Sequence, residues 1–164
     1  MSAARRIDVG AIAPQRWKNG AGLTREIALG PAGAGLDDFG WRLSVAELER
    51  DAPFSAFPGI DRCIVVIDGA GMALHDAAGA PVRTLAPLEP WAFEGERALH
   101  AHLAHGPCRD FNVMTRRGVC THSLTRARVE SPNLMPQRIQ SFVDAVYEST
   151  FAILKSLGDA EADQ

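Results

Sequence analysis

Turn-forming glycine and proline residues separate the apolar residues of the chain into short runs, and this pattern limits the folds that the chain can adopt. Its 164 residues include 15 glycines and 10 prolines. Apolar and polar residues alternate in WRLSVAEL (41–48), so that Leu43 and Val45 share one face of a strand and polar residues take the other. CIVVID (63–68) is continuously apolar, which predicts a central strand covered on both faces. The region from about residue 7 to residue 125 therefore predicts an antiparallel β-sandwich or barrel of many short strands.

The sequence changes character towards its C-terminal end. In SFVDAVYESTFAILKSL (141–157), Phe142 and Val146 begin a series of apolar residues at helical spacing. This pattern predicts an amphipathic helix of roughly four to five turns, followed by an acidic tail. We therefore expect a β domain over residues 1–128, and a loop, this helix and the tail over residues 129–164.

Composition disfavours several classes of function. The formal net charge is −3, from 17 basic and 20 acidic residues, which argues against nucleic-acid binding. No apolar run is long enough to span a bilayer, and the segment MSAARRIDVG lacks the apolar part of a secretory signal. The three cysteines form neither a CxxC pair nor a zinc-binding spacing, which is typical of reduced thiols in the cytoplasm. We expect a cytoplasmic protein that binds neither nucleic acid nor membrane and uses no cofactor.

Three longer motifs follow one another along the chain: WKNGAGLTREI (17–27), WRLSVAELERDAPFSAFPGIDRCIVVIDGAGMAL (41–74) and GPCRDFNVMTRRG (106–118). Together they resemble the HutD/Ves family of small cupin-like proteins, with a likeness that runs from about Ile7 to Gly118. The resemblance implies a cupin-type β-sandwich, usually of two lobes, and an association with histidine utilisation. It also implies binding of a small acidic metabolite, for which N-formylglutamate is the proposed ligand, without an established catalytic activity.

The C-terminal part departs from the family pattern, in which further strands complete a second lobe. Here VCTHSLTRARVESPNLMPQ (119–137) leads into the predicted helix. We therefore expect a mainly β, cupin-like antiparallel jelly roll whose C-terminal helix replaces part of the second lobe. The helix would cover apolar faces of the first lobe, and a partner subunit in a homodimer is the alternative cover.

The first motif carries polar side chains that a simple turn does not require. Asn19 and the neighbouring glycines predict a tight turn at one mouth of the sandwich. Alternation places Thr24 and Glu26 on one face of the next strand and Arg25 on the other, so these three cannot all point into one cavity. The alternative is a solvated hairpin turn in which Trp17 plugs the core. With the family resemblance, we expect ligand contacts among Lys18, Asn19, Thr24, Arg25 and Glu26.

The second motif contains FSAFPGIDR (54–62), in which Ser55, Asp61 and Arg62 cluster around a Pro-Gly turn. An arginine presents a planar fork that binds a carboxylate through two hydrogen bonds. The three residues are therefore candidates for binding an acidic ligand. The alternative is that Asp61 and Arg62 pair with other side chains and hold the loop in place.

The third motif contains RDFNVMTRR (109–117), in which alternation places Asp110, Asn112, Met114 and Arg116 on one face. Such a polar face is reasonable if it lines a cavity, because each buried polar group needs a partner. We take Asn112 and Arg116 as candidate ligand contacts. The alternative is an exposed face of an antiparallel sheet.

Histidines are the candidates for a metal site. His100 and His102 share one face of ALHAHLAH (98–105), and His105 follows them. The HxH spacing is the way in which metal-binding cupins present two ligands, but the usual downstream glutamate is absent. A metal site needs three or four converging ligands. We therefore expect two solvent-facing histidines and no bound metal, with these three histidines as the alternative ligand set.

The resemblance to the HutD/Ves family implies a non-catalytic protein that binds a small anionic metabolite of histidine breakdown, with regulation as a role open to it. The candidate residues of the three motifs support this function if they surround one cavity. A metal-dependent cupin enzyme that uses the histidines is one alternative. An oligomeric protein with a role in regulation or assembly, built around the unusual C-terminal helix, is the other.

Overall fold

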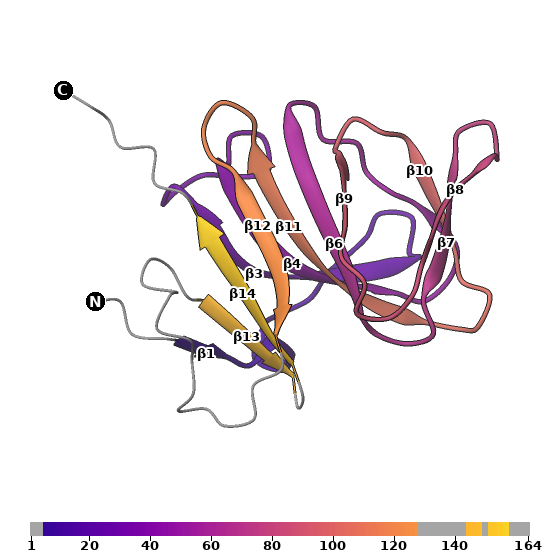
Figure 1. Ribbon diagram of the computed structural model, residues 1–164, viewed down its shortest axis with the longest axis horizontal. Helices are drawn as coiled ribbons and strands as arrows, with labels where there is room; N and C mark the ends of the chain where they lie inside the picture. Colours follow the sequence, from indigo (N-terminus) through magenta and orange to yellow (C-terminus); the bar gives the residue numbers. More distant parts are fainter. Residues whose placement is uncertain (1–4, 128–143, 149–150, 158–164) are drawn as a thin grey trace.

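The computed structural model describes the backbone of residues 5–127, 144–148 and 151–157, and the side chains of residues 7–124 (Figure 1). Strands dominate these residues, and a short 3-10 helix at Val9–Ala11 precedes the first long strands. The strands along the chain are β1 (Arg5–Ile7), β2 (Gln15–Arg16), β3 (Gly22–Gly30), β4 (Trp41–Leu48), β5 (Ala52–Pro53), β6 (Ile60–Asp68), β7 (Met72–Asp76), β8 (Pro81–Leu85), β9 (Trp91–Glu94), β10 (Leu99–His102), β11 (Cys108–Arg116), β12 (His122–Ala127), β13 (Asp144–Glu148) and β14 (Phe151–Leu157).

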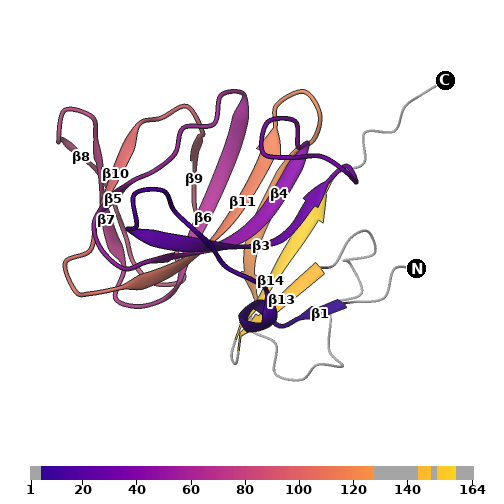
Figure 2. The same ribbon diagram turned by 180° about the vertical axis from the view of Figure 1, so that it is seen from behind.

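The strands form three sheets, of which the largest has six strands in the order β2-β3-β4-β11-β6-β9. One four-stranded sheet has the order β5-β10-β7-β8, and the other has the order β1-β13-β14-β12. The six-stranded sheet lies between the two smaller sheets when the molecule is seen from either side (Figures 1 and 2). Pairing between the described strands is antiparallel, apart from the parallel pair β1 and β13. The mainly β, antiparallel architecture confirms the predicted fold class.

The helix predicted over residues 141–157 is wrong wherever the structure describes this region. Asp144–Glu148 and Phe151–Leu157 are strands, paired with each other and with β1 and β12. Short apolar runs fit helical and strand spacing equally well, so pairing with strands distant in sequence decides between the two. The predicted loop before this region and the acidic tail after it lie outside the described residues.

Alternate residues of the central strands enter two cores, one on each face of the six-stranded sheet. In β6, Ile64 and Val66 belong to the core shared with the sheet β5-β10-β7-β8, whereas Cys63 belongs to the opposite core. In β4, Leu43 and Val45 face that opposite core, as their alternation predicted. The expectation that the strand containing residues 63–68 is covered on both faces is therefore confirmed. In the described part of the chain, no helix is long and apolar enough to cross a membrane.

Two glycines shape the turn that leads into β3. Gly20 has a φ of +67°, which glycine adopts at little cost, and its N–H donates to the carbonyl of Trp17 at 3.0 Å. Gly22 is needed for a different reason, because an added Cβ there would lie 2.4 Å from the carbonyl oxygen of Glu47 on β4. Close approach of β3 to β4 at this end therefore requires glycine at position 22.

We predict that Gly22→Ala destabilises the protein much more than Gly20→Ala does. The Cβ of Gly22→Ala collides with backbone, and forced overpacking of this kind costs about 3 kcal/mol. The Cβ of Gly20→Ala would lie 3.3 Å from the mobile end of Arg50, so its cost is the left-handed backbone, about 1 kcal/mol. Urea unfolding of both variants measures the two free energies. Equal losses of stability would contradict the close approach of β3 and β4.

Candidate functional site

The six-stranded sheet carries both polar and apolar side chains on the face that it shares with the sheet β5-β10-β7-β8, and a cavity of about 570 Å³ opens there. This volume falls within the range of small-molecule sites, roughly 300–1,000 Å³. Its aromatic walls come from Trp17, Phe54 and Phe57. Its polar lining consists of Gln15, Arg16, Lys18, Asn19, Thr24, Arg42, Ser44, Ser55, Arg62, Asp110 and Asn112.

The antiparallel register brings the polar residues together. Directly paired residues on neighbouring strands point to the same face of a sheet, so polar residues of different strands meet on one face. The rows across β4, β11 and β6 are Arg42–Met114–Arg62, Ser44–Asn112–Ile64 and Ala46–Asp110–Val66. The predicted alternation of Asp110, Asn112 and Met114 is confirmed, and all three line the cavity.

The turn between β2 and β3 forms one edge of the cavity. The side-chain oxygen of Asn19 accepts from the N–H of Ala21 at 3.0 Å, and Nε1 of Trp17 donates to Oγ1 of Thr24 at 2.8 Å. Trp17 lines the cavity and also packs against the hydrophobic core beside it, as the alternative of a core plug predicted. Lys18 lies beside it and is exposed.

Arg62 is a buried cation of the cavity lining, only 6% exposed. Its guanidinium carbon lies 4.9 Å from the ring centroid of Phe93 and 5.5 Å from those of Phe54 and Phe57. Nη1 donates to the carbonyl of Ser55 at 3.1 Å, but Nε has no hydrogen-bond partner among the described residues. Burial lowers the pKa of Arg62 to about 10, so the side chain stays charged at neutral pH. Aromatic faces stabilise this cation, and its Nε–H is buried.

Arg42 is a second buried arginine in the same row. Its Nε donates to Oε2 of Glu26 at 3.0 Å, and its Nη1 contacts the sulfur of Met114 at 3.8 Å. The ion pair neutralises Arg42, so Glu26 acts on the cavity through this arginine and is not itself part of the lining. Sequence alternation placed Arg42 on the polar face of a half-buried strand and gave no reason to expect its burial.

Asp110 and Asn112 present buried acceptors that lack partners. Asp110 is 1% exposed, and neither of its carboxylate oxygens has a hydrogen-bond partner among the described residues. The same holds for Oδ1 of Asn112, which is 6% exposed. Burial raises the pKa of Asp110 to about 7, and the positive charge of Arg62 opposes this rise. Buried polar atoms without partners are uncommon, and these belong to two residues of the cavity lining.

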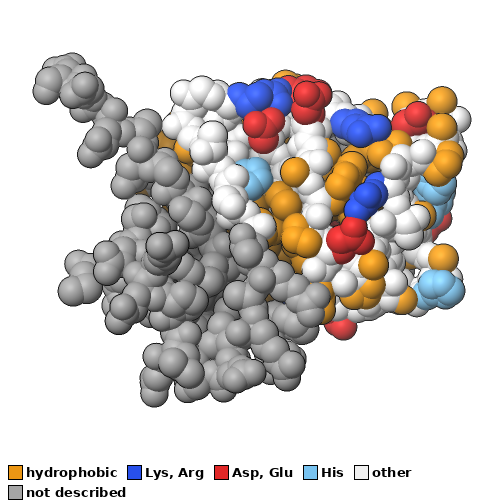
Figure 3. Space-filling view, in the orientation of Figure 1, with side chains coloured by type: hydrophobic (Ala, Val, Ile, Leu, Met, Phe, Trp, Pro, Cys, Tyr) orange, Lys and Arg blue, Asp and Glu red, His pale blue; other side chains and the backbone are white. Residues whose placement is uncertain are grey.

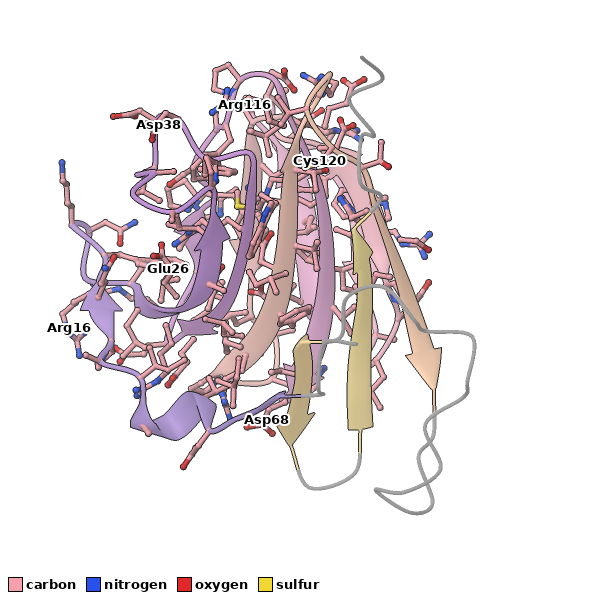
Figure 4. The ribbon with its side chains drawn as sticks, turned by 90° about the vertical axis from the view of Figure 1, so that its left-hand side faces the viewer. Arg16, Glu26, Asp38, Asp68, Arg116 and Cys120 are labelled. Atoms are coloured by element: carbon pink, nitrogen blue, oxygen red, sulfur yellow. The ribbon has the colours of Figure 1, made fainter. Side chains whose placement is uncertain are left out.

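The structure brings together six of the residues predicted as ligand contacts and leaves four outside the lining. Those that line the cavity are Lys18, Asn19, Thr24, Ser55, Arg62 and Asn112. Glu26 lies next to it through Arg42, and Arg25, Asp61 and Arg116 lie elsewhere. Figure 4 shows Glu26 on the side of the molecule formed by β2 and β3, with Arg116 away from it at the end of β11.

The three residues that lie elsewhere are engaged in structural contacts. Arg25 points to the opposite face of β3, where it pairs with Glu47 at 2.7 Å and donates to the carbonyl of Ile12. Asp61 accepts from Arg117 at 2.7 Å, which matches the alternative that it pairs with another side chain. Arg116 donates to the carbonyls of Phe39 at 2.8 Å and Asp37 at 3.0 Å, and so holds the loop before β4.

The histidines form a cluster on a different sheet. His75 of β7 joins His100 and His102 of β10, with its ring centroid 4.5 Å from that of His102. Nδ1 of His102 lies 2.9 Å from Oδ2 of Asp51, and His105 is exposed beyond the strand. Histidine side chains appear at the edge of the molecule over β7, β8 and β10 (Figure 3). Within the part of the chain described, no group of three or more His, Cys, Asp or Glu side chains is placed to hold a metal ion.

We predict that Asp110→Asn stabilises the protein increasingly as the pH rises from about 4 to about 7. The pKa of Asp110 is raised from 3.8 to about 7 on folding, so ionisation of the unfolded chain over this range lowers the stability of the wild type. One pKa unit corresponds to about 1.4 kcal/mol, so the gain approaches about 4 kcal/mol at pH 8 and vanishes below pH 4. Urea unfolding at several pH values measures it. Asp61→Asn, outside the cavity, is the matched control, and an equal gain in both variants would contradict the assignment.

Comparisons with known proteins agree with this architecture. The HutD family profile matches residues 10–154. An uncharacterised 21.2 kDa protein in the hutC 3′ region of Pseudomonas putida is 47% identical over 98 residues, which is 60% of this chain and 50% of that relative. The chain therefore spans about half the length of this curated relative.

Solved structures show the same likeness. A conserved protein of unknown function from Pseudomonas aeruginosa PAO1 is 40% identical, with a TM-score of 0.68 over 74% of this chain and 61% of that one. HutD from Pseudomonas fluorescens SBW25 is 41% identical, with a TM-score of 0.66 over 72% of this chain and 63% of that one. A Klebsiella pneumoniae protein with a double-stranded β-helix domain, 14% identical and with a TM-score of 0.51 over 71% of this chain and 94% of that one, shares the fold alone. From the span of the profile and the identity of these relatives, the chain belongs to the HutD family.

Proposed function

We propose that this protein binds a small anionic metabolite in the cavity, and that Arg62 is the principal contact for an acid group. The observation that carries the proposal is the state of the Arg62 guanidinium. It is buried at a cavity and held over three phenylalanine rings, and its Nε has no partner among the described residues. A charged N–H in this setting forms a strong hydrogen bond with a carboxylate.

The charge of the lining supports an anionic ligand. Arg42 and Glu26 neutralise each other, and the raised pKa of Asp110 leaves this acid partly neutral near pH 7. Arg62 keeps its charge, and the lining also includes Arg16 and Lys18. The resulting excess of positive charge favours anions and lowers the affinity for cationic compounds.

The walls support a ligand with a short carbon skeleton. Trp17, Phe54 and Phe57 give the cavity apolar surfaces, while the polar groups converge from the sheet. Ligand sites in proteins combine apolar walls with a few polar groups in this way. The volume of about 570 Å³ is sufficient for a small metabolite with acid groups.

N-formylglutamate is our candidate ligand, with a regulatory role in histidine utilisation in the cytoplasm. It carries two carboxylates and a formylated nitrogen, and the family resemblance of the three sequence motifs implies it. The names of the relatives, HutD and a protein in the hutC 3′ region, support the connection with histidine utilisation.

We predict that Arg62→Gln weakens the binding of N-formylglutamate by about 10- to 100-fold. A hydrogen bond to a charged group contributes about 1.5–3 kcal/mol, which corresponds to this range of affinity. Isothermal titration calorimetry of the wild type and the variant measures the dissociation constants. Arg62→Lys, which keeps the charge and loses the planar fork, should fall between the two.

Arg83→Gln is the matched control, because Arg83 on β8 pairs with Glu89 and does not line the cavity. Its affinity should equal that of the wild type. Circular dichroism establishes that each variant is folded before titration. If the folded wild type binds none of N-formylglutamate, glutamate and glutarate at millimolar concentration, the proposed function is overturned.

A further inference from the structure

Asp110 is an acid that the cavity lining buries among apolar neighbours. It is 1% exposed, and the residues paired with it across β4 and β6 are Ala46 and Val66. Neither oxygen of its carboxyl group has a hydrogen-bond partner among the described residues. Burial of this kind favours the neutral, protonated acid, because an ionised carboxylate loses more by leaving water than a neutral carboxyl group does.

Arg62 supplies the positive charge that acts on this carboxyl group. Burial raises the pKa of Asp110 to about 7, and the charge of Arg62 opposes a larger rise. Arg62 is also the proposed contact for the acid group of a ligand. One buried guanidinium therefore stabilises either an ionised Asp110 or a bound anion, and the two compete for it.

Other charged groups of the lining do not take the place of Arg62. Arg42 on β4 forms an ion pair with Glu26 on β3, which neutralises it. Arg16 on β2 and Lys18 in the turn that follows are both exposed. Water and salt screen charges at the surface, so these two act weakly on the buried acid.

The remaining ionisable groups around Asp110 are neutral, exposed or turned away from it. Cys108 on the same strand has a thiol whose pKa rises to about 12, mainly through burial, so it stays neutral. Asp68 is exposed at the end of β6. The sheet β5-β10-β7-β8 directs Leu74 and Ala101 towards this core, and alternation places its histidines on the other face. These histidines are His75, His100 and His102.

We propose that the binding of an acid in the cavity is coupled to the uptake of a proton by Asp110. This inference rests on the proposed function, because it concerns the regulation of that same site. A bound carboxylate takes up the charge of Arg62 and adds a negative charge to the cavity, and both effects destabilise an ionised Asp110. The proton comes from the solvent and binds the carboxylate of Asp110, while every bond of the ligand stays intact. The occupancy of the cavity therefore depends on pH.

The affinity for an anion should fall as the pH rises from 6 to 8.5. Asp110, with a pKa of about 7, is mostly protonated at the lower end of this range and mostly ionised at the upper end. At the upper end the acid must gain a proton or remain as a charge that repels the ligand. Arg62, with a pKa of about 10, keeps its charge throughout. An anion within about 8 Å shifts the protonation of a partly buried acid about tenfold or more, so the affinity should fall about tenfold.

Isothermal titration calorimetry with N-formylglutamate measures both parts of this coupling. Titrations at pH 6 and pH 8.5 give the change in affinity. Titrations at pH 7.5 in phosphate and in Tris, whose ionisation enthalpies differ, count the protons taken from the buffer, and we expect about half a proton for each ligand bound. Glutarate is the second probe at pH 7.5 and should show a similar uptake, because the coupling depends on the acid groups.

The variant Asp110→Asn keeps the shape of the side chain and cannot ionise. Its affinity should change less than about twofold between pH 6 and pH 8.5, and it should take up no proton at pH 7.5. At pH 8.5 it should bind several-fold more tightly than the wild type, a gain that a purely structural role of Asp110 would not produce. Asp61→Asn is the matched control, because Asp61 pairs with Arg117 outside the cavity, and it should keep the proton uptake of the wild type.

The outcomes separate this inference from the function on which it rests. If the wild type binds an acid equally well at pH 6 and pH 8.5 without proton uptake, and Arg62→Gln weakens that binding, the anion site stands and the inference is overturned. The inference is also overturned if Asp110→Asn, folded by circular dichroism, keeps the pH dependence of the wild type. If none of N-formylglutamate, glutamate and glutarate binds the folded wild type, the proposed function fails and this inference fails with it.

Discussion

The register between β4, β11 and β6 is the constraint on which the cavity depends. It places Arg42 beside Met114 and Met114 beside Arg62, with Asn112 and Asp110 in the two rows that follow. A slip of one residue would turn every side chain of a strand to the opposite face of the sheet. These polar groups would then be buried in the hydrophobic core on that face. Irregularities in pairing occur beside Asp110 on β11 and beside Glu26 on β3, and bulges of this kind often re-aim side chains at functional sites.

The same register places stabilising apolar side chains and destabilising buried charges on one face of the six-stranded sheet. This face carries apolar side chains such as Ile64 and Val66, which pair with Asn112 and Asp110 and stabilise the fold by leaving water. The same face carries a buried arginine and a buried aspartate, whose burial costs free energy. The phenylalanine rings around Arg62 offset part of this cost, and they also tie the loop that carries Phe54 and Phe57 to the site. Stability given up at a binding site in this way is a common feature of functional proteins.

Local alternation was enough to anticipate part of the site. It placed Asp110, Asn112 and Met114 together on one face, and it separated Thr24 from Arg25, because successive side chains of a strand point in opposite directions. It did not reveal the partners of the remaining charged residues. Arg25 is held by Glu47 on a neighbouring strand and Asp61 by Arg117, and such contacts depend on how the strands pair and turn.

The burial of Arg42 and the C-terminal strands could not be predicted from local sequence, because contacts with other segments decide them. Arg42 has the sequence setting of a solvent-facing residue on a half-buried strand, yet it is buried at the cavity, where it contacts Glu26 on β3 and Met114 on β11. Residues 144–148 and 151–157 have apolar spacing that suits a helix, yet pairing with β1 and β12 makes them strands. In both cases the deciding contacts come from segments far away along the chain, which a local pattern does not contain.

The sequence by itself determined that this chain forms short antiparallel strands, and which side chains share a face within each strand, because strand periodicity and turn residues are local properties. The tertiary structure alone decided which of those faces meet at one cavity. It also decided which charged groups there have partners and which do not, because burial and pairing depend on the layers that cover each face.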